Sequence, residues 1–303
     1  MNKKIAVLLG GISAEKKVSS ETGRYVAKSL DEQGYKVKKI KVSFNKKFLI
    51  KSLKKFKPDL VFNALHGTFG EDGQVQKLLD KLKLKYSHSS AKASDIAMDK
   101  KKAKLVFKKI GVPYPNDINV NINNFKKKIK QLTFPFPLVI KPTSEGSSLG
   151  VKICQNINEL KEYKLKKNIN YLIEEYIPGR ELTVGIFKNK ALDVIELKTK
   201  KDFYDYKSKY TKGMTKYIIP ASIPKDIENK CKKYALKIHK FLKCKSVTRT
   251  DFRFDEKKSL GKKLFVLEIN TQPGMTPLSL VPMMAKYKGI SFNKLIKEII
   301  SEI

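Results

Sequence analysis

Apolar and polar residues alternate in blocks along the first part of the chain. Residues 5–9 form a continuous apolar run of the kind that is buried on both faces of a sheet, and residues 60–65 form a second, mainly apolar run. Residues 14–30 carry apolar positions at helical spacing, and residues 35–42 are expected to form another strand. Strands that alternate with helices predict a parallel, doubly wound sheet, so residues 1–95 are expected to form an N-terminal α/β domain.

Two further regions are expected, over residues 96–180 and residues 181–303. The first of these begins with a single helix over residues 95–109, whose lysines Lys100 to Lys102 mostly face solvent at helical spacing. The second contains an aromatic-rich loop, residues 203–217, which we expect to close as a lid over bound ligands. Further strands are predicted at residues 137–142, 151–154, 171–176, 181–187, 191–198, 247–254 and 263–270, and further helices at residues 225–242, 279–286 and 292–301.

The last two predicted strands form a hairpin with one apolar and one polar face, because side chains alternate across a strand. An Asp, a Glu and an Asn on the polar face make an all-oxygen set suited to Mg²⁺ and phosphates. The alternative is a solvated hairpin with ordinary cross-strand pairs. The apolar face is expected to carry Phe265, Leu267 and Ile269, and the polar face Val266, Arg249, Arg253 and the candidate ligands Asp251, Glu268 and Asn270.

Two other segments have features of a nucleotide site. Lys141 lies at a strand end and precedes the small-residue loop 143–150, which could hold phosphates by charge and backbone N–H groups. Residues 172–177 form an acidic, aromatic strand end that could bind an adenine amino group and ribose hydroxyls. The alternative for the loop 143–150 is an ordinary turn, and the alternative for residues 172–177 is an exposed strand end.

The chain is strongly basic, with a formal net charge of +36 from 65 lysines and arginines against 29 aspartates and glutamates. A nucleic-acid-binding protein is one interpretation of this charge. Such proteins usually depend on arginine for bidentate contacts, whereas only four of the basic residues here are arginine and lysine is spread along the whole chain. We therefore expect no nucleic-acid partner, only an attraction for anions such as ATP.

Compartment and cofactor class follow from what the sequence lacks. No apolar stretch approaches the roughly 18 residues that span a bilayer, so no membrane association is expected. The apolar run near the N-terminus is too short for a signal peptide. The three cysteines have no paired or metal-binding spacing, which fits a reducing cytoplasm, and the three histidines are too scattered for a zinc motif.

Six segments have sequences typical of one known family: residues 5–15 (IAVLLGGISAE), 65–73 (LHGTFGEDG), 98–100 (MDK), 140–148 (IKPTSEGSS), 203–210 (FYDYKSKY) and 267–282 (LEINTQPGMTPLSLVP). The chain resembles the D-alanine–D-alanine ligases of the ATP-grasp superfamily over essentially its full length. The resemblance implies an ATP-grasp fold of α/β and α+β lobes. It also implies ATP-dependent joining of two D-alanines through a D-alanyl phosphate, for peptidoglycan precursor synthesis.

The resemblance implies a role for each site residue. Two Mg²⁺ ions, for which Mn²⁺ could substitute, would be held by Asp251, Glu268 and Asn270. ATP would be bound by Lys100, Lys141, Glu145, Glu174, Tyr176, Ile177, Glu181 and Lys209. The first D-alanine would be bound by Glu15 and His66. The oxyanion would be stabilised by Arg249 and Gly274. The second D-alanine would be bound by Ser279 and Leu280. Ser147 and Tyr210 would bond to Glu15 and tie the mobile loop to the first lobe.

Two positions depart from the usual pattern of the family. Tyr176 stands where tryptophan is frequent, and Gln272 occupies a slot where smaller residues are common and is expected to face away from the metals. The nearest rival is a sibling ligase that takes D-lactate or D-serine as second substrate. Relatives that make the depsipeptide lack the Tyr-Asp-Tyr…Lys-Tyr pattern of residues 204–210, so D-alanine is predicted instead. The intact site residues argue against an inactive ATP-binding relative, and the family suggests a homodimer.

Overall fold

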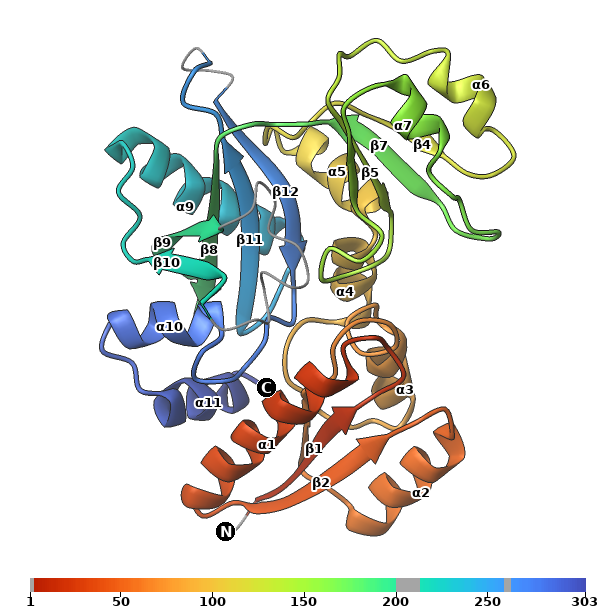
Figure 1. The fold of residues 1–303 in the computed structure, drawn as a ribbon. Helices are drawn as coiled ribbons and strands as arrows, with labels where there is room; N and C mark the ends of the chain where they lie inside the picture. The colour runs from red at the N-terminus through yellow and green to blue at the C-terminus, as the bar shows by residue number, and fades with distance from the viewer. Residues whose placement is uncertain (1–2, 200–212, 259–262) are drawn as a thin grey trace.

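The computed structural model describes residues 3–199, 213–258 and 263–303, whose strands form three sheets (Figure 1). The N-terminal lobe contains strands β1 (Lys4–Gly10), β2 (Lys36–Val42) and β3 (Leu60–Asn63), and helices α1 (Lys16–Glu32), α2 (Lys46–Phe56) and α3 (Gln74–Lys81). Its strands are all parallel, in the order β2-β1-β3, which confirms the prediction for this sheet.

Strand β1 is buried on both faces, which explains its continuous apolar run. Ala6 and Leu8 pack into a core with Leu49 of α2. Ile5 and Val7 pack into a second core, which also contains residues of α1 and of the helices near the C-terminus. The N-terminal lobe therefore packs directly against the last part of the chain.

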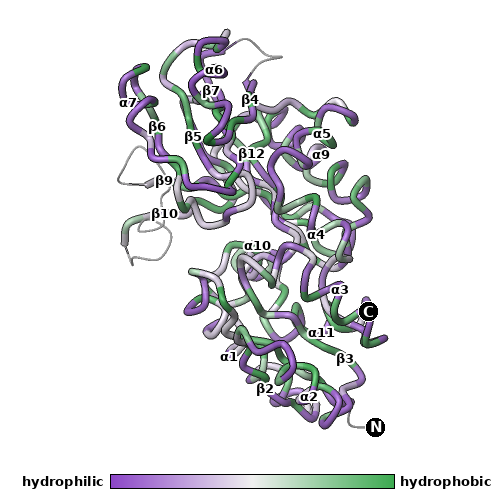
Figure 2. The backbone as a smooth tube through the Cα atoms, turned by 90° about the vertical axis from the view of Figure 1, so that its right-hand side faces the viewer, coloured by the Kyte–Doolittle hydropathy of each residue, from purple (hydrophilic) through white to green (hydrophobic). Residues whose placement is uncertain are grey.

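The central sheet is antiparallel and has its own core. It consists of β4 (Asp117–Val120), β5 (Leu138–Pro142), β6 (Lys152–Cys154) and β7 (Tyr171–Glu175), in the order β4-β7-β5-β6, with the short helices α6 (Phe125–Ile129) and α7 (Ile157–Lys161). The core comprises Val120, Phe125, Ile129, Leu138, Ile140, Cys154, Leu160, Tyr171 and Ile173. This central lobe stands apart from the N-terminal lobe in Figures 1 and 2.

The segment before the central sheet differs from its prediction. It forms two helices, α4 (Ala91–Met98) and α5 (Lys100–Lys109), rather than one. Asp99 between them is extended, with φ −84° and ψ 104°, and its carboxylate accepts hydrogen bonds from the backbone N–H groups of Lys101 and Lys102. This cap starts a new helix axis, so the predicted exposure of Lys100 is wrong and its side chain is buried.

The largest sheet is antiparallel, in the order β10-β9-β8-β11-β12. Its strands are β8 (Arg180–Phe187), β9 (Lys190–Thr199), β10 (Thr215–Ile218), β11 (Val247–Phe254) and β12 (Leu264–Asn270). Helix α9 (Lys225–Phe241) packs on this sheet, and α10 (Leu280–Tyr287) and α11 (Phe292–Ser301) follow it. Strand β10 falls where a loop was predicted, and the part of the predicted lid at residues 203–212 lies outside the described residues.

A β-bulge changes the predicted faces of β12. Asp251 pairs with Glu268, but the next residue, Phe252, pairs with Val266, so Leu267 is the extra residue. The simple alternation is therefore wrong beyond this point: Val266 is buried in the core, while Leu267 lines a cavity beside Glu268.

The outer helices are amphipathic, and in Figure 2 hydrophobic and hydrophilic residues alternate along α2 and α9. In the part of the chain that the structure describes, no helix combines the length and apolar character needed to cross a bilayer.

Candidate active site

Two adjoining cavities lie where the lobes meet. The large cavity, about 500 Å³, is lined by the start of α1, the loops after β3 and β5, and the end of the β11–β12 hairpin. The small cavity lies beside it and is lined mainly by β5, β7 and the same hairpin. Five residues line both cavities: Lys100, Glu145, Glu181, Asp251 and Glu268.

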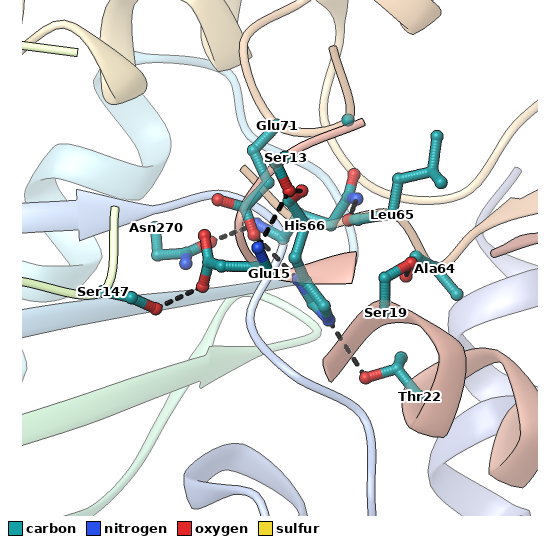
Figure 3. Close-up of polar contacts among 12 residues, drawn as sticks. Ser13, Glu15, Ser19, Thr22, Ala64, Leu65, His66, Glu71, Ser147 and Asn270 are labelled. Atoms are coloured by element: carbon teal, nitrogen blue, oxygen red, sulfur yellow. Dashed lines mark hydrogen bonds and ion pairs between the residues drawn. The ribbon is translucent and has the colours of Figure 1, made fainter. Parts of the chain in front are cut away.

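Glu15 is a buried carboxylate at the start of α1 in the large cavity. The Ser147 hydroxyl, from the loop after β5, donates a hydrogen bond to its Oε1 (Figure 3). The loop approaches closely because residue 146 is glycine: a Cβ there would lie 2.9 Å from Glu15 Oε2. The structure thus joins residues 132 positions apart, one from the N-terminal lobe and one from the central lobe.

His66 is buried in the wall of the large cavity and is fixed at both ring nitrogens (Figure 3). Its Nδ1 lies 2.8 Å from Glu71 Oε1, and its Nε2 lies 3.0 Å from Thr22 Oγ1. Burial lowers the pKa of His66, but the hydrogen bond and charge of Glu71, with the charge of Glu15, outweigh this and raise the pKa above its ordinary value. The imidazole is therefore suited to carry positive charge beside the cavity.

Asp251 is held by side chains of its own sheet. Arg249 donates from Nε to Asp251 Oδ1 at 2.9 Å and from a terminal nitrogen to Oδ2 at 2.8 Å, and the Thr183 hydroxyl donates to Oδ1 at 2.6 Å. A bidentate guanidinium pair of this kind fixes the carboxylate plane. Arg249, like Asp251, lines the large cavity.

Glu268 and Asn270 line the large cavity together with Asp251, as expected of a shared oxygen-ligand site. Lys100 Nζ lies 3.6 Å from Glu268 Oε2 and donates to the Glu145 carbonyl at 2.7 Å. Among the described residues, no three His, Cys, Asp or Glu side chains are grouped so as to hold a metal. An ion here would thus depend on the Asn270 amide oxygen and on oxygens of a ligand.

Glu174, in the small cavity, is buried between two lysines. Lys104 Nζ donates to Glu174 Oε2 at 2.8 Å and to Asp117 at 3.0 Å, while Lys141 Nζ donates to Glu174 Oε1. Burial alone would raise the pKa of Glu174, but the two lysine charges lower it below its ordinary value. Burial, together with the charges of Lys104 and Lys100, lowers the pKa of Lys141 below its ordinary value despite the opposing effect of Glu174.

Arg253 organises the other side of the small cavity. Its Nε donates to the carbonyl of Ile177 at 2.9 Å, and its guanidinium lies 5.7 Å from the centre of the Tyr176 ring, a cation–π distance. A terminal nitrogen lies 3.5 Å from Glu181 Oε2. One buried arginine thus fixes three residues that were predicted to contact adenosine.

The loop after β12 brings Gly274, Ser279 and Leu280 to the large cavity. Ser279 Oγ accepts a hydrogen bond from the backbone N–H of Thr276 at 3.1 Å, and α10 begins at the next residue. A Cβ at Gly274 would lie 3.0 Å from Ser279 Oγ, so glycine permits this tight turn.

Lys209 and Tyr210, predicted to bind ATP and to join the Glu15 group, lie outside the described residues. The other predicted site residues all line one or both cavities. Sequence reasoning missed Lys104, Arg253 as an organising residue, Thr183 and Glu71. Lys104 and Thr183 line neither cavity, whereas Glu71 and Arg253 line one each and act through neighbouring side chains. A charged residue at a buried helix or strand position could have indicated Lys104 and Arg253, but this signal does not apply to Thr183 or to the loop residue Glu71.

Comparison with known proteins agrees with this geometry. Residues 106–301 match the family model described as D-ala D-ala ligase C-terminus. The chain is 48% identical over 307 residues to the D-alanine–D-alanine ligase of Pelagibacter ubique, covering 100% of this chain and 98% of the relative. It is 44% identical over 307 residues to that of Zymomonas mobilis, covering 99% and 94%.

Solved structures show the same likeness over almost the whole chain. The D-alanine–D-alanine ligase from Bacillus anthracis complexed with ATP matches with a TM-score of 0.83 at 33% identity, covering 99% of this chain and 97% of that one. A D-Ala:D-Ser ligase from Enterococcus faecalis matches with a TM-score of 0.82 at 26% identity, covering 99% of each chain.

The fold and the paired cavities define an ATP-grasp enzyme. The family model covers more than half of the chain, and the two relatives match it over 98% and 94% of their own length. The chain belongs to the D-alanine–D-alanine ligase family.

Proposed function

We propose that this enzyme binds ATP with its base in the small cavity and joins two D-alanine molecules in the large one. The chain is a D-alanine–D-alanine ligase, whose dipeptide product serves peptidoglycan precursor synthesis. One observation carries the proposed arrangement: among the described residues, Lys100 and four carboxylates line both cavities, where a triphosphate accompanied by metal ions would pass from one to the other. The Bacillus anthracis relative was solved with ATP, which supports the nucleotide assignment.

Adenosine binding is assigned to Glu174, Tyr176, Ile177 and Glu181. Glu174 is kept ionised by its lysines and so acts as an acceptor, which suits the adenine amino group. Lys100 and Lys141, with Lys209 and the loop at Glu145, would contact the phosphates. Lys141 Nζ donates to Glu174 in the structure, and because an ammonium has three donors it would be able to bind a phosphate as well.

Asp251, Glu268 and Asn270 would hold the two Mg²⁺ ions, or Mn²⁺ in their place. The donor set fits, since all three offer oxygen and face one cavity. When bound, the ions neutralise phosphate charge during phosphoryl transfer. Arg249 would loosen its pair with Asp251 and, together with the Gly274 backbone N–H, donate to the substrate oxyanion.

The reaction consists of two displacements. A carboxylate oxygen of the first D-alanine attacks the γ-phosphorus of ATP, ADP leaves, and D-alanyl phosphate forms. The amine of the second D-alanine then attacks the acyl carbon and loses a proton, and phosphate leaves with the electron pair of the C–O bond. Positioning both reactants makes this second step effectively intramolecular.

The two amino acids occupy opposite walls of the large cavity in this proposal. Glu15 would pair with the ammonium of the first D-alanine, and His66 would lie near its carboxylate, consistent with the raised pKa of His66. Ser147 and Tyr210 would hold Glu15 and close the loops. Ser279 and Leu280, at the start of α10, would receive the carboxylate of the second D-alanine.

The experiment is phosphate release with ATP and D-alanine alone, compared with D-alanine plus D-lactate or D-serine, at neutral pH with mass identification of the product. We expect one D-alanyl-D-alanine per phosphate and little mixed product. A clear preference for D-lactate or D-serine would overturn the assignment of the second substrate.

The remaining assignments concern the whole chain. We assign residues 1–95, 96–180 and 181–303 as domains. The middle one has its own core from residue 118 onward, whereas apolar side chains of residues 97–112 pack into the core of the largest sheet. A homodimer is proposed from the family, to be tested by sedimentation. The cytoplasm, where ATP is available, is the proposed compartment, and the three cysteines are free and buried, which fits a reducing environment.

A further inference from the structure

Gln272 lies between Asn270 and Gly274, the proposed metal ligand and the proposed oxyanion donor. It is 1% exposed and lines neither cavity. Its backbone N–H donates to Asn270 Oδ1 at 2.6 Å, so its position is tied to the orientation of that amide.

The Gln272 side chain crosses to the N-terminal lobe. Its Oε1 accepts a hydrogen bond from Asn63 Nδ2 at 2.8 Å, and its Nε2 donates to the carbonyl of Leu65. These partners are 209 and 207 positions away in the sequence. Both the oxygen and the nitrogen of the Gln272 amide are therefore hydrogen-bonded, in a buried link between the loop after β12 and the end of β3.

The far end of this link fixes the loop that carries His66. Asn63 is fully buried at the end of β3, and its Nδ2 also donates to the carbonyl of Gly70 at 3.0 Å. Its Oδ1 accepts from the backbone N–H of Leu65 at 3.2 Å. Leu65, the second partner of Gln272, immediately precedes His66.

We infer that Gln272 is a positioning residue for ligation, which sets the Asn270–Gly274 segment against the His66 loop. The inference rests on the proposed function, because it treats these two segments as halves of one catalytic site. A misplacement of about 1 Å between such halves can cost about 10²-fold in rate. Breaking the bonds of a buried amide also lowers the stability of the fold by about 1–3 kcal/mol for each group left unsatisfied. If that were the whole effect, the role of Gln272 would be structural.

Gln76 provides a matched control for that structural role. It is also a fully buried glutamine, and its Nε2 donates to the same Gly70 carbonyl at 2.9 Å. Both of those residues belong to the N-terminal lobe, and Gln76 lines neither cavity. Gln76 thus resembles Gln272 in burial and in donating from its amide nitrogen, but among the described residues its Oε1 has no hydrogen-bond partner and its side chain does not cross between the two halves of the site.

The test compares Gln272→Met with Gln76→Met in the full-length enzyme. Gln272→Met should lower Tm more than Gln76→Met, because it breaks two amide hydrogen bonds rather than one. Only Gln272→Met should reduce kcat, by about 10- to 100-fold. KM for ATP should stay within about 3-fold of wild type, because the residues proposed to bind adenosine lie in β7, just after it and in β8. Equal kcat in the two variants would overturn the inference.

A second variant covers failure of Gln272→Met to fold. Gln272→Asn keeps a buried amide but is one methylene too short to make both bonds, and we expect the same selective loss of kcat. Wild-type kcat in Gln272→Asn would overturn the inference. Failure of the proposed function is distinguishable, since the wild-type enzyme itself would then release no phosphate with D-alanine.

Discussion

The Asp251 carboxylate illustrates how one residue serves two partners. Arg249 occupies both of its oxygens, and Thr183 bonds to one of them. The same carboxylate faces the cavity beside Glu268 and Asn270. In the proposed metal site, a pre-oriented carboxylate would lose little further freedom when an ion binds, so the pair with Arg249 would prepare Asp251 for the ion before releasing it.

We predict that Asp251→Asn lowers kcat by at least about 100-fold, since even outer partners of metal ligands cost about 10–100-fold. The assay is phosphate release across a Mg²⁺ titration. Asp255→Asn is the control: Asp255 is a buried aspartate just after the same strand, its carboxylate accepts a hydrogen bond from the backbone N–H of Lys257, and it lines neither cavity. Full activity of Asp251→Asn would contradict the metal assignment.

His88 is predicted to make stability depend on pH. Burial and the nearby charge of His66 lower the pKa of His88 to about 3, so only the unfolded state gains its proton as pH falls below about 6.5. The contribution of neutral His88 to the free energy of unfolding is fully present above pH 6.5. It is lost as the pH falls towards 3, at about 1.4 kcal/mol per pH unit.

His88→Asn should remove this dependence, and asparagine tolerates the φ of 71° at this position. Urea unfolding at pH 7, 6 and 5 measures this pH dependence. The free energy of unfolding should fall more for the wild type than for the variant each time the pH is lowered. Parallel pH curves for the two proteins would refute the assignment.

At the scale of elements, tight turns position the strands that carry the site. The bulge at Leu267 turns the end of β12 so that Glu268 reaches the cavity, and the turn at Pro178-Gly179 brings β8 back beside β11. At Gly179, φ is 93°, and a Cβ would lie 2.2 Å from the carbonyl oxygen of Phe254. Two elements thus meet backbone to backbone at this glycine.

Gly179→Ala should destabilise the protein by more than about 3 kcal/mol, because the overlap adds to the backbone strain of about 1–3 kcal/mol. Gly34→Ala is the control: its φ is 81°, but nothing lies within 4 Å of the added Cβ. That variant should cost only about 1–2 kcal/mol. Chemical denaturation measures both, and equal losses would show that strain alone matters at Gly179.

At the scale of the whole molecule, the N-terminal lobe and the C-terminal helices share a core, whereas the central lobe has its own. In the proposed arrangement, the two D-alanine sites would lie mainly on one packed block, and the nucleotide pocket would lie between that block and the central lobe. The whole assembly carries a net charge of +36, which favours anionic ligands.

We predict that KM for ATP rises several-fold between about 0.05 and 0.5 M salt, because the Debye length falls well below about 10 Å. D-Alanine is a zwitterion without net charge, so its KM should change by less than about 2-fold. Steady-state kinetics in sodium and in potassium chloride measure both effects. Equal changes for the two substrates would refute long-range attraction as the cause.

Much of the fold could be predicted because its elements carry strong local patterns. The continuous apolar run of β1, the helical period of α1 and α9 and the alternation along β11 are all detectable in the sequence. The short elements β4 and α6 were missed, and so were the longer helices α2 and α3. The break at Asp99 was missed because a capping aspartate also fits a helix interior by spacing.

The sequence by itself determined the family, the parallel N-terminal sheet and the types of residue in the site, because these depend on local pattern and on characteristic strings. Only the tertiary structure decided which residues meet. The Glu15–Ser147 bond, the Glu174 lysine pair and the link from Gln272 to Asn63 join distant segments. Such contacts depend on how whole lobes pack, and no local period or motif encodes that distance.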